Sequence, residues 1–214
     1  MKIPVAISLS GVRLALYILA GFALGGVAAL AVFPAARERL LSPLAMHSVG
    51  QALVGGPFTL TDQTGRRVTD QDFRGKFMLV YFGFTFCPDV CPTALQVMAA
   101  ALDKLGPEAE RITPVLITID PERDTPAQLA MYVKSFHPRL VGLTGSPKEI
   151  EDAARAYRVY VKKVPDPKST AGYTMDHSSI IYVMGPDGKY RGHFTHATSA
   201  DVMAERLAGM LRSP

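Results

Sequence analysis

The feature of this sequence that most restricts its fold is a run of twenty residues without a charge. Residues 14–33 read LALYILAGFALGGVAALAVF. A helix of that length spans about 30 Å, which matches the hydrocarbon core of a bilayer. Secretory signal peptides have apolar regions of about 7–15 residues and end at a small-residue cleavage site, which Pro34-Ala35-Ala36 matches only in part. We therefore predict one uncleaved transmembrane anchor at residues 14–33, with a cleaved signal peptide as the alternative.

Both alternatives place the rest of the chain outside the cytoplasm. Basic residues lie on both sides of the run, Lys2 and Arg13 before it and Arg37 after it, so these charges orient the helix only weakly. The sequence has no Arg- and Ser-rich transit segment, which favours a bacterium over an organelle. We predict a single-pass protein of the bacterial cytoplasmic (inner) membrane whose soluble domain lies on the periplasmic side.

The remaining sequence is long enough for one domain with a hydrophobic core. The chain has 214 residues, of which 48% are hydrophobic and 20% charged, and this composition excludes a mostly disordered polymer. The net charge of +4 comes without a clustered basic stripe, so no nucleic-acid partner is expected. We predict a short N-terminal segment (1–13), the anchor (14–33), a linker (34–56) and one domain (57–214).

Within this domain, strands and helices alternate. The predicted strands are 58–62 and 66–69, which form a hairpin around Gln63-Thr64-Gly65, followed by 77–84, 114–119, 178–184 and 190–195. The predicted helices begin at Pro92, after Thr125-Pro126, after Ser146-Pro147 and at Ala200, and end near residues 105, 136, 158 and 211. This order predicts an α/β fold of thioredoxin type, with a central mixed sheet flanked by helices and an N-terminal hairpin.

The two cysteines, Cys87 and Cys91, lie between the first buried strand and its helix. A helix N-terminus stabilises thiolate, and a spacing of four residues, about one helical turn, allows the two sulfurs to converge on one point or to form a disulfide. The spacing is not Cys-x-x-Cys. The peroxiredoxin pattern Pro-x-x-x-Thr-x-x-Cys is also absent, since Val80 and Phe84 stand at its positions before Cys87.

Two thiolates in an oxidising compartment suit a soft metal, and copper(I) is the leading candidate. His177, at the start of the predicted strand 178–184, is the candidate third ligand. It stands near the place where thioredoxin-type folds usually carry a proline that faces the cysteines. An imidazole there favours a metal site over a purely redox one.

Three segments carry a resemblance to a known family. They are YFGFTFCPDVCP at residues 81–92, IDPERDTP at 119–126 and DHSS at 176–179. They resemble the Sco/SenC family of copper-binding proteins, over residues of about 50–212, and that family also has one N-terminal anchor. The resemblance implies that Cys87, Cys91 and His177 bind copper, as Cu(I) or Cu(II). It further implies a role in assembling the dinuclear copper centre of cytochrome c oxidase.

Two functions stay open on this sequence. The first is a copper chaperone, which transfers its metal to another protein and catalyses no reaction. The second is a thiol-disulfide reductase that keeps the cysteines of the oxidase copper site reduced. The expected partners are the copper-centre subunit of the oxidase, another periplasmic copper chaperone or thiol reductant, and the membrane. A thiol peroxidase is disfavoured because its motif is absent.

Other residues near these motifs have less specific roles. Asp120 and Asp124 order a loop or cap a helix, and the resemblance adds a role for Asp120 near the copper loop or a partner surface. Asp89 tunes copper(II) or shapes its turn, and Met175 is a candidate weak ligand. Lys162, Lys163 and Lys168 form a solvated face or a docking site for an acidic partner. The remaining histidines, at positions 47, 137, 193 and 196, are not expected to be ligands.

Overall fold

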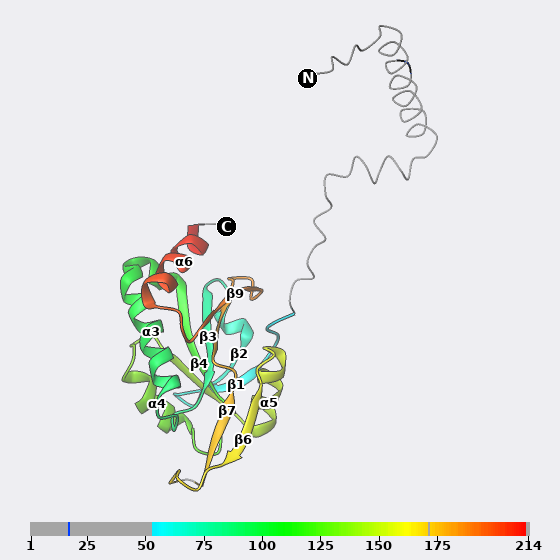
Figure 1. Cartoon of the computed structure of the whole chain (residues 1–214), viewed down its shortest axis with the longest axis vertical. Helices are drawn as coiled ribbons and strands as arrows, with labels where there is room; N and C mark the ends of the chain where they lie inside the picture. Colours follow the sequence, from blue (N-terminus) through cyan, green and yellow to red (C-terminus); the bar gives the residue numbers. More distant parts are fainter. Residues whose placement is uncertain (1–16, 18–52, 171, 213–214) are drawn as a thin grey trace, which may run out of the picture. The chain divides into compact units, whose positions relative to one another are not determined.

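The computed structural model describes Tyr17, residues 53–170 and residues 172–212 (Figure 1). Except for Tyr17, the predicted anchor at 14–33 lies outside the described residues, and so does the linker up to residue 52. Among the helices that the structure describes, none is both long and apolar enough to cross a bilayer.

The domain is built on a mixed seven-stranded sheet with the strand order β2-β1-β5-β4-β3-β8-β9. Its strands are β1 (Thr59–Asp62), β2 (Arg67–Thr69), β3 (Phe77–Gly83), β4 (Ile112–Thr118), β5 (Val141–Thr144), β8 (Ile180–Met184) and β9 (Tyr190–Thr195). Strand β3 pairs parallel with β4 and antiparallel with β8. Strands β1 and β2 form the predicted N-terminal hairpin.

A second, two-stranded sheet consists of β6 (Val161–Pro165) and β7 (Tyr173–His177), which pair antiparallel. The helices are α3 (Val90–Leu105), α4 (Pro126–Lys134), α5 (Pro147–Ala156) and α6 (Ala200–Arg212), with short 3-10 helices at Asp70–Phe73 and Gly106–Arg111. Figure 1 shows α3, α4 and α6 along one side of the central strands and α5 on the other side.

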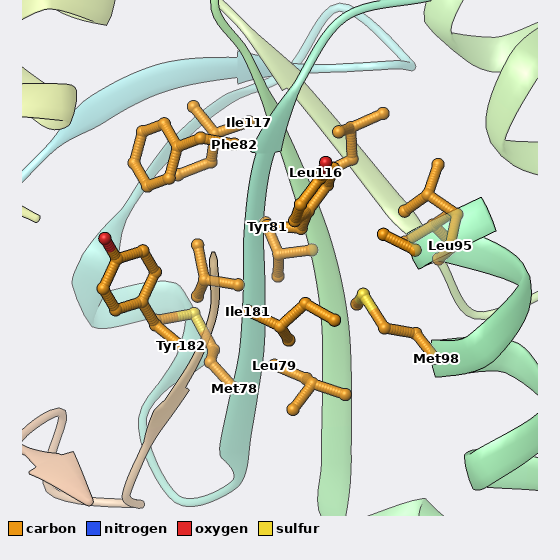
Figure 2. Packing of buried hydrophobic residues seen from close by; sticks show 14 of the residues in the cluster. Met78, Leu79, Tyr81, Phe82, Leu95, Met98, Leu116, Ile117, Ile181 and Tyr182 are labelled. Atoms are coloured by element: carbon orange, nitrogen blue, oxygen red, sulfur yellow. The ribbon is translucent and has the colours of Figure 1, made fainter. Parts of the chain in front are cut away.

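The core lies on both faces of β3, whose seven residues are all buried. Leu79 and Tyr81 point toward α3, while Met78 and Phe82 point to the opposite face, as the two-residue repeat of a strand requires (Figure 2). This explains the continuous apolar sequence of β3, since a strand covered on both faces has no solvent side. The loop that carries Cys87 therefore begins at the end of a firmly packed strand.

The starts of α4 and α5 confirm the predicted caps. The Thr125 side chain accepts a hydrogen bond from the Gln128 N–H at 3.2 Å. At α5, Ser146 and Glu149 form a reciprocal capping box. In both helices a proline occupies the first position, where a missing N–H costs nothing.

Three features differ from the prediction. Helix α3 begins at Val90 rather than Pro92, because a proline is tolerated anywhere among the unpaired N–H groups of a first turn. Strand β5 and the β6–β7 sheet were not expected: β5 has only four residues, and β6 (VKKVP) lacks apolar alternation. His177 is consequently the last residue of β7 and does not begin β8.

Candidate metal centre

The two cysteines occupy different kinds of backbone. Cys87 lies in the loop after β3, three residues before the first residue of α3, and is partly exposed. Cys91 is the second residue of α3 and is fully buried. Both are free thiols. The sequence predicted that one helical turn would bring the two cysteines together. That detail is wrong, because Cys87 lies in the loop before α3.

The sulfur of Cys87 caps the start of α3. It accepts the N–H of Cys91 at 3.4 Å, while the side chain of the N-cap residue Asp89 makes no capping hydrogen bond. Hydrogen bonds from the Cys91 thiol and from the backbone N–H groups of Cys91 and Asp89 lower the pKa of Cys87 to about 5, although burial opposes this shift. Cys87 is therefore a thiolate at neutral pH, as the position before a helix predicts.

Cys91 keeps its proton in the metal-free protein. Its pKa is raised because the thiol donates to Cys87, because the side chain is buried, and because the Cys87 charge lies nearby. The hydroxyl of the buried Tyr81 donates to the Cys91 sulfur at 3.7 Å. A metal that bound both sulfurs would displace the Cys91 proton.

His177 completes this group from the end of β7. Its Nε2 lies 3.6 Å from the Cys91 sulfur, although 86 residues separate the two in sequence. Its Nδ1 lies 3.1 Å from the carbonyl oxygen of Ser178. Because a carbonyl only accepts, Nδ1 carries the proton, and the lone pair of Nε2 faces the sulfur. Burial lowers the pKa of His177, which favours the neutral, ligating form.

Aromatic rings and backbone contacts fix the imidazole. The rings of Tyr81 and Phe84 meet it edge-on, with centroids 6.1 and 6.0 Å away. Val161 of β6 pairs with His177, and the next residue, Ser178, donates its N–H to the Tyr160 carbonyl at 3.2 Å. No three His, Cys, Asp or Glu side chains of the described residues are already arranged around a common metal position. Ligation by Cys87, Cys91 and His177 stays a prediction.

The two aspartates of the DPERD segment have distinct structural roles. Asp124 is fully buried and accepts the N–H and hydroxyl of Thr85, at 3.0 and 2.6 Å, and the hydroxyl of Thr118 at 2.6 Å. It thereby ties the cysteine loop to β4. Asp120, also buried, accepts from the Tyr173 hydroxyl at 3.0 Å and from Arg123 Nε. Neither aspartate caps α4, because the N-cap residue of that helix is Thr125.

The structure also places most of the other residues considered from the sequence. Asp89 is exposed. Met175 lines a cavity of about 530 Å³ beside α5 and β6. Lys162 and Lys168 are exposed, and Lys163 pairs with Glu122 at 2.6 Å. His193 and His196 are exposed, and His137 accepts the Arg139 N–H, whereas His47 lies outside the described residues.

Sequence reasoning missed Tyr81, Arg123 and Tyr173. The first two stand inside the segments YFGF and DPERD that carried the resemblance, so their place in those motifs was a usable signal. Tyr173 had no such signal, because β7 itself was not predicted.

Comparisons with known proteins match this chain to one family. The SCO1/SenC family profile matches residues 47–212. The mitochondrial SCO1 homolog of Homo sapiens is 42% identical over 196 residues, which make up 89% of this chain and 64% of the human protein. This chain thus covers slightly less than two thirds of that relative.

Solved structures show the same fold. Arabidopsis thaliana ScoI with copper bound is 42% identical, with a TM-score of 0.72 over 75% of this chain and 99% of that one. BsSco, described as having a disulfide switch and as a member of the Sco family of cytochrome c oxidase assembly proteins, is 25% identical, with a TM-score of 0.61 over 77% of this chain and 98% of that one. The predicted thioredoxin-like α/β fold with a mixed central sheet is therefore confirmed, and the chain belongs to the SCO1/SenC family.

Proposed function

We propose that this protein is a membrane-anchored copper chaperone that binds copper through Cys87, Cys91 and His177 and assists assembly of the dinuclear copper centre of cytochrome c oxidase. The observation that carries the proposal is the contact between the Cys91 sulfur and His177 Nε2 at 3.6 Å. The copper-bound relative and the family's description as oxidase assembly proteins support it.

The donor set fits copper. Two sulfurs suit Cu(I), and the imidazole adds a donor that also suits Cu(II). Cys87 is already ionised near neutral pH, and His177 is neutral, so only the Cys91 proton must leave. Copper is here a cargo that the protein receives from another periplasmic copper chaperone and passes to the oxidase subunit.

The location follows from the sequence. Residues 14–33 would anchor the chain in the bacterial inner membrane, and residues 34–56 would link that anchor to the domain at 57–214. This arrangement would hold the site on the periplasmic side, within reach of a membrane-bound oxidase. The support is the length of the uncharged run.

The reductase alternative rests on the thiol pair itself. The Cys87 thiolate would attack a disulfide of the oxidase subunit and form a mixed disulfide. Cys91 would then lose its proton and displace the second target sulfur, which leaves a reduced target and a Cys87–Cys91 disulfide. A periplasmic thiol reductant would restore the pair. The low pKa and partial exposure of Cys87 favour this chemistry.

One titration separates the two functions. The reduced full-length chain in detergent is titrated anaerobically with Cu(I), alongside Cys87→Ser, Cys91→Ser and His177→Ala, with the exposed His193→Ala as the matched control. We expect one copper per chain and weaker binding in the first three variants only. If the chain binds no stoichiometric copper but its Cys87–Cys91 pair still exchanges disulfides, the result contradicts the chaperone and supports the reductase.

A further inference from the structure

Arg123 lies between the two parts of the chain that carry the proposed ligands. Its guanidinium carbon is 4.8 Å from the ring centroid of Phe86, the residue before Cys87. It is 4.0 Å from the centroid of Tyr173, the first residue of β7, and 5.7 Å from that of Phe84. One planar cation therefore contacts both the cysteine loop and the strand that ends at His177.

Polar contacts fix the same guanidinium. Its Nε donates to Asp120, and Nη1 donates to the Tyr173 carbonyl at 3.5 Å. The Tyr173 hydroxyl donates to the other oxygen of Asp120 at 3.0 Å. Asp120 in turn is held at the end of β4, where its N–H donates to the Thr118 hydroxyl at 3.0 Å. Arg123, Asp120 and Tyr173 thus form a closed set of contacts.

The arrangement leaves one donor group unused. Nη2 of Arg123 is buried and has no hydrogen-bond partner among the described residues, and the side chain as a whole is only 16% exposed. Burying such a group without a partner is unfavourable. The contacts of the guanidinium with the aromatic rings and with Asp120 must outweigh the cost of leaving Nη2 unpaired. These contacts therefore set the position of the guanidinium.

The strand that carries His177 needs such an attachment. In the described part of the chain, β6 and β7 pair only with each other, and their sheet is separate from the seven-stranded one. A two-stranded ribbon is marginal by itself. Ser178 and Ser179 join β7 to β8 of the main sheet at the His177 end. Side-chain contacts to the main sheet therefore set where the rest of β7 lies, and Arg123 supplies several of them.

We propose that Arg123 is a positioning residue that holds His177 against Cys91. This inference rests on the proposed copper site. Arg123 acts by two routes, through Tyr173 at the other end of β7 and through Phe84, whose ring also meets the imidazole edge-on. Without Arg123, the cysteines would stay in place and the imidazole would lose its fixed position.

The test combines Arg123→Ala with His177→Ala in the full-length chain in detergent. Cu(I) affinity is measured anaerobically, and nitrogen coupling from the imidazole is measured by electron paramagnetic resonance after Cu(II) loading. Removal of a group that orients a metal ligand typically lowers affinity about 10–100-fold. We expect a loss of that size in Arg123→Ala, loss of the nitrogen coupling, and no further loss in the double variant.

The matched control is Arg206→Ala, which removes an arginine 4.9 Å from the Phe194 ring, on α6; it should bind copper like the wild type. If Arg123→Ala does not fold, Arg123→Lys is measured instead. It keeps the charge beside Asp120, lacks the planar group, and should also lose the nitrogen coupling.

The outcomes separate the two proposals. A wild-type chain that binds no copper contradicts the proposed function. A His177→Ala variant with unchanged affinity and coupling removes His177 from the site. Weakened binding in His177→Ala, together with wild-type nitrogen coupling in a folded Arg123 variant, overturns only the role of Arg123. Losses that add up in the double variant overturn it as well, because they would show that Arg123 does not act through His177.

Discussion

The sulfur of Cys91 lies 3.1 Å from the point that a Cβ atom on Gly83 would occupy. The ring of Tyr81 is closer still, with Cε1 at 2.8 Å from the same point. Both neighbours are fully buried and have little room to move. The absence of a side chain at the last residue of β3 therefore makes the space in which Cys91 and Tyr81 meet.

Gly83→Ala should destabilise the domain, because its methyl group would overlap two packed groups. Overpacking of this kind typically costs about 1–3 kcal/mol, and Cu(I) affinity should fall with it. Urea unfolding and copper titration measure the two effects. Gly209→Ala on α6 is the control, since a methyl group there would meet no atom within 4 Å beyond its own helix backbone and alanine favours a helix. Equal stability of the two variants would contradict the argument.

Tyr81→Phe should remove the hydroxyl that donates to Cys91 and raise the pKa of that thiol further. The loss of one such hydrogen bond costs about 1 kcal/mol of the free energy of unfolding. Tyr132→Phe is the comparison, because the Tyr132 hydroxyl is buried and has no partner among the described residues. Its removal should be neutral or stabilising. A larger loss in Tyr132→Phe than in Tyr81→Phe would refute this assignment.

Alkylation of reduced, copper-free protein should follow the pKa of Cys87. Thiolate is the reactive form, and a pKa lowered to about 5 means that the rate rises through pH 5 and is level by pH 7. Mass spectrometry after iodoacetamide pulses measures the profile. Cys91→Ala removes the main donor to Cys87 and should shift the profile to higher pH. A wild-type midpoint near that of an ordinary thiol would contradict the capped-thiolate geometry.

Asp124→Ala should loosen the cysteine loop. The substitution removes the acceptor for the Thr85 N–H and for the hydroxyls of Thr85 and Thr118. A buried polar group left unpaired typically costs about 1–3 kcal/mol, so urea unfolding should show a loss of at least that size. Asp187→Ala, in an exposed turn, is the control and should change little. Unchanged stability in Asp124→Ala would mean that the loop does not depend on this carboxylate.

The sequence predicted the elements whose residues carry a strong local signal. Strand β3 is continuously apolar, and Thr125-Pro126 and Ser146-Pro147 mark helix starts that the structure confirms. Strand β6 has two lysines among its five residues and no apolar alternation, and seven residues separate it from β7, so no short-turn hairpin pattern indicated the pairing. Because β7 was not predicted, His177 was assigned to the start of the following strand.

The candidate site was predictable only in part. The residue types and the cysteine spacing indicated a soft-metal site, and the place of His177 in a thioredoxin-type fold made it the candidate third ligand before the family resemblance added support. The DPERD segment drew attention to Arg123, but its contacts were not predictable, because they join the β4–α4 connection to the cysteine loop and to β7 at once. Such three-way contacts leave no periodic pattern in a sequence.

The proposed ligands come from two parts of the domain, built on two sheets that share no strand pairing in the described residues. Cys87 lies in the loop after β3 and Cys91 in the first turn of α3, whereas His177 ends a strand of the separate β6–β7 sheet. If the proposed function holds, we expect a recipient protein to take over the copper one bond at a time, with the imidazole released first while both sulfurs still hold the metal. Rapid-mixing spectroscopy of the handover would resolve this order, and simultaneous loss of sulfur and nitrogen ligation would exclude it.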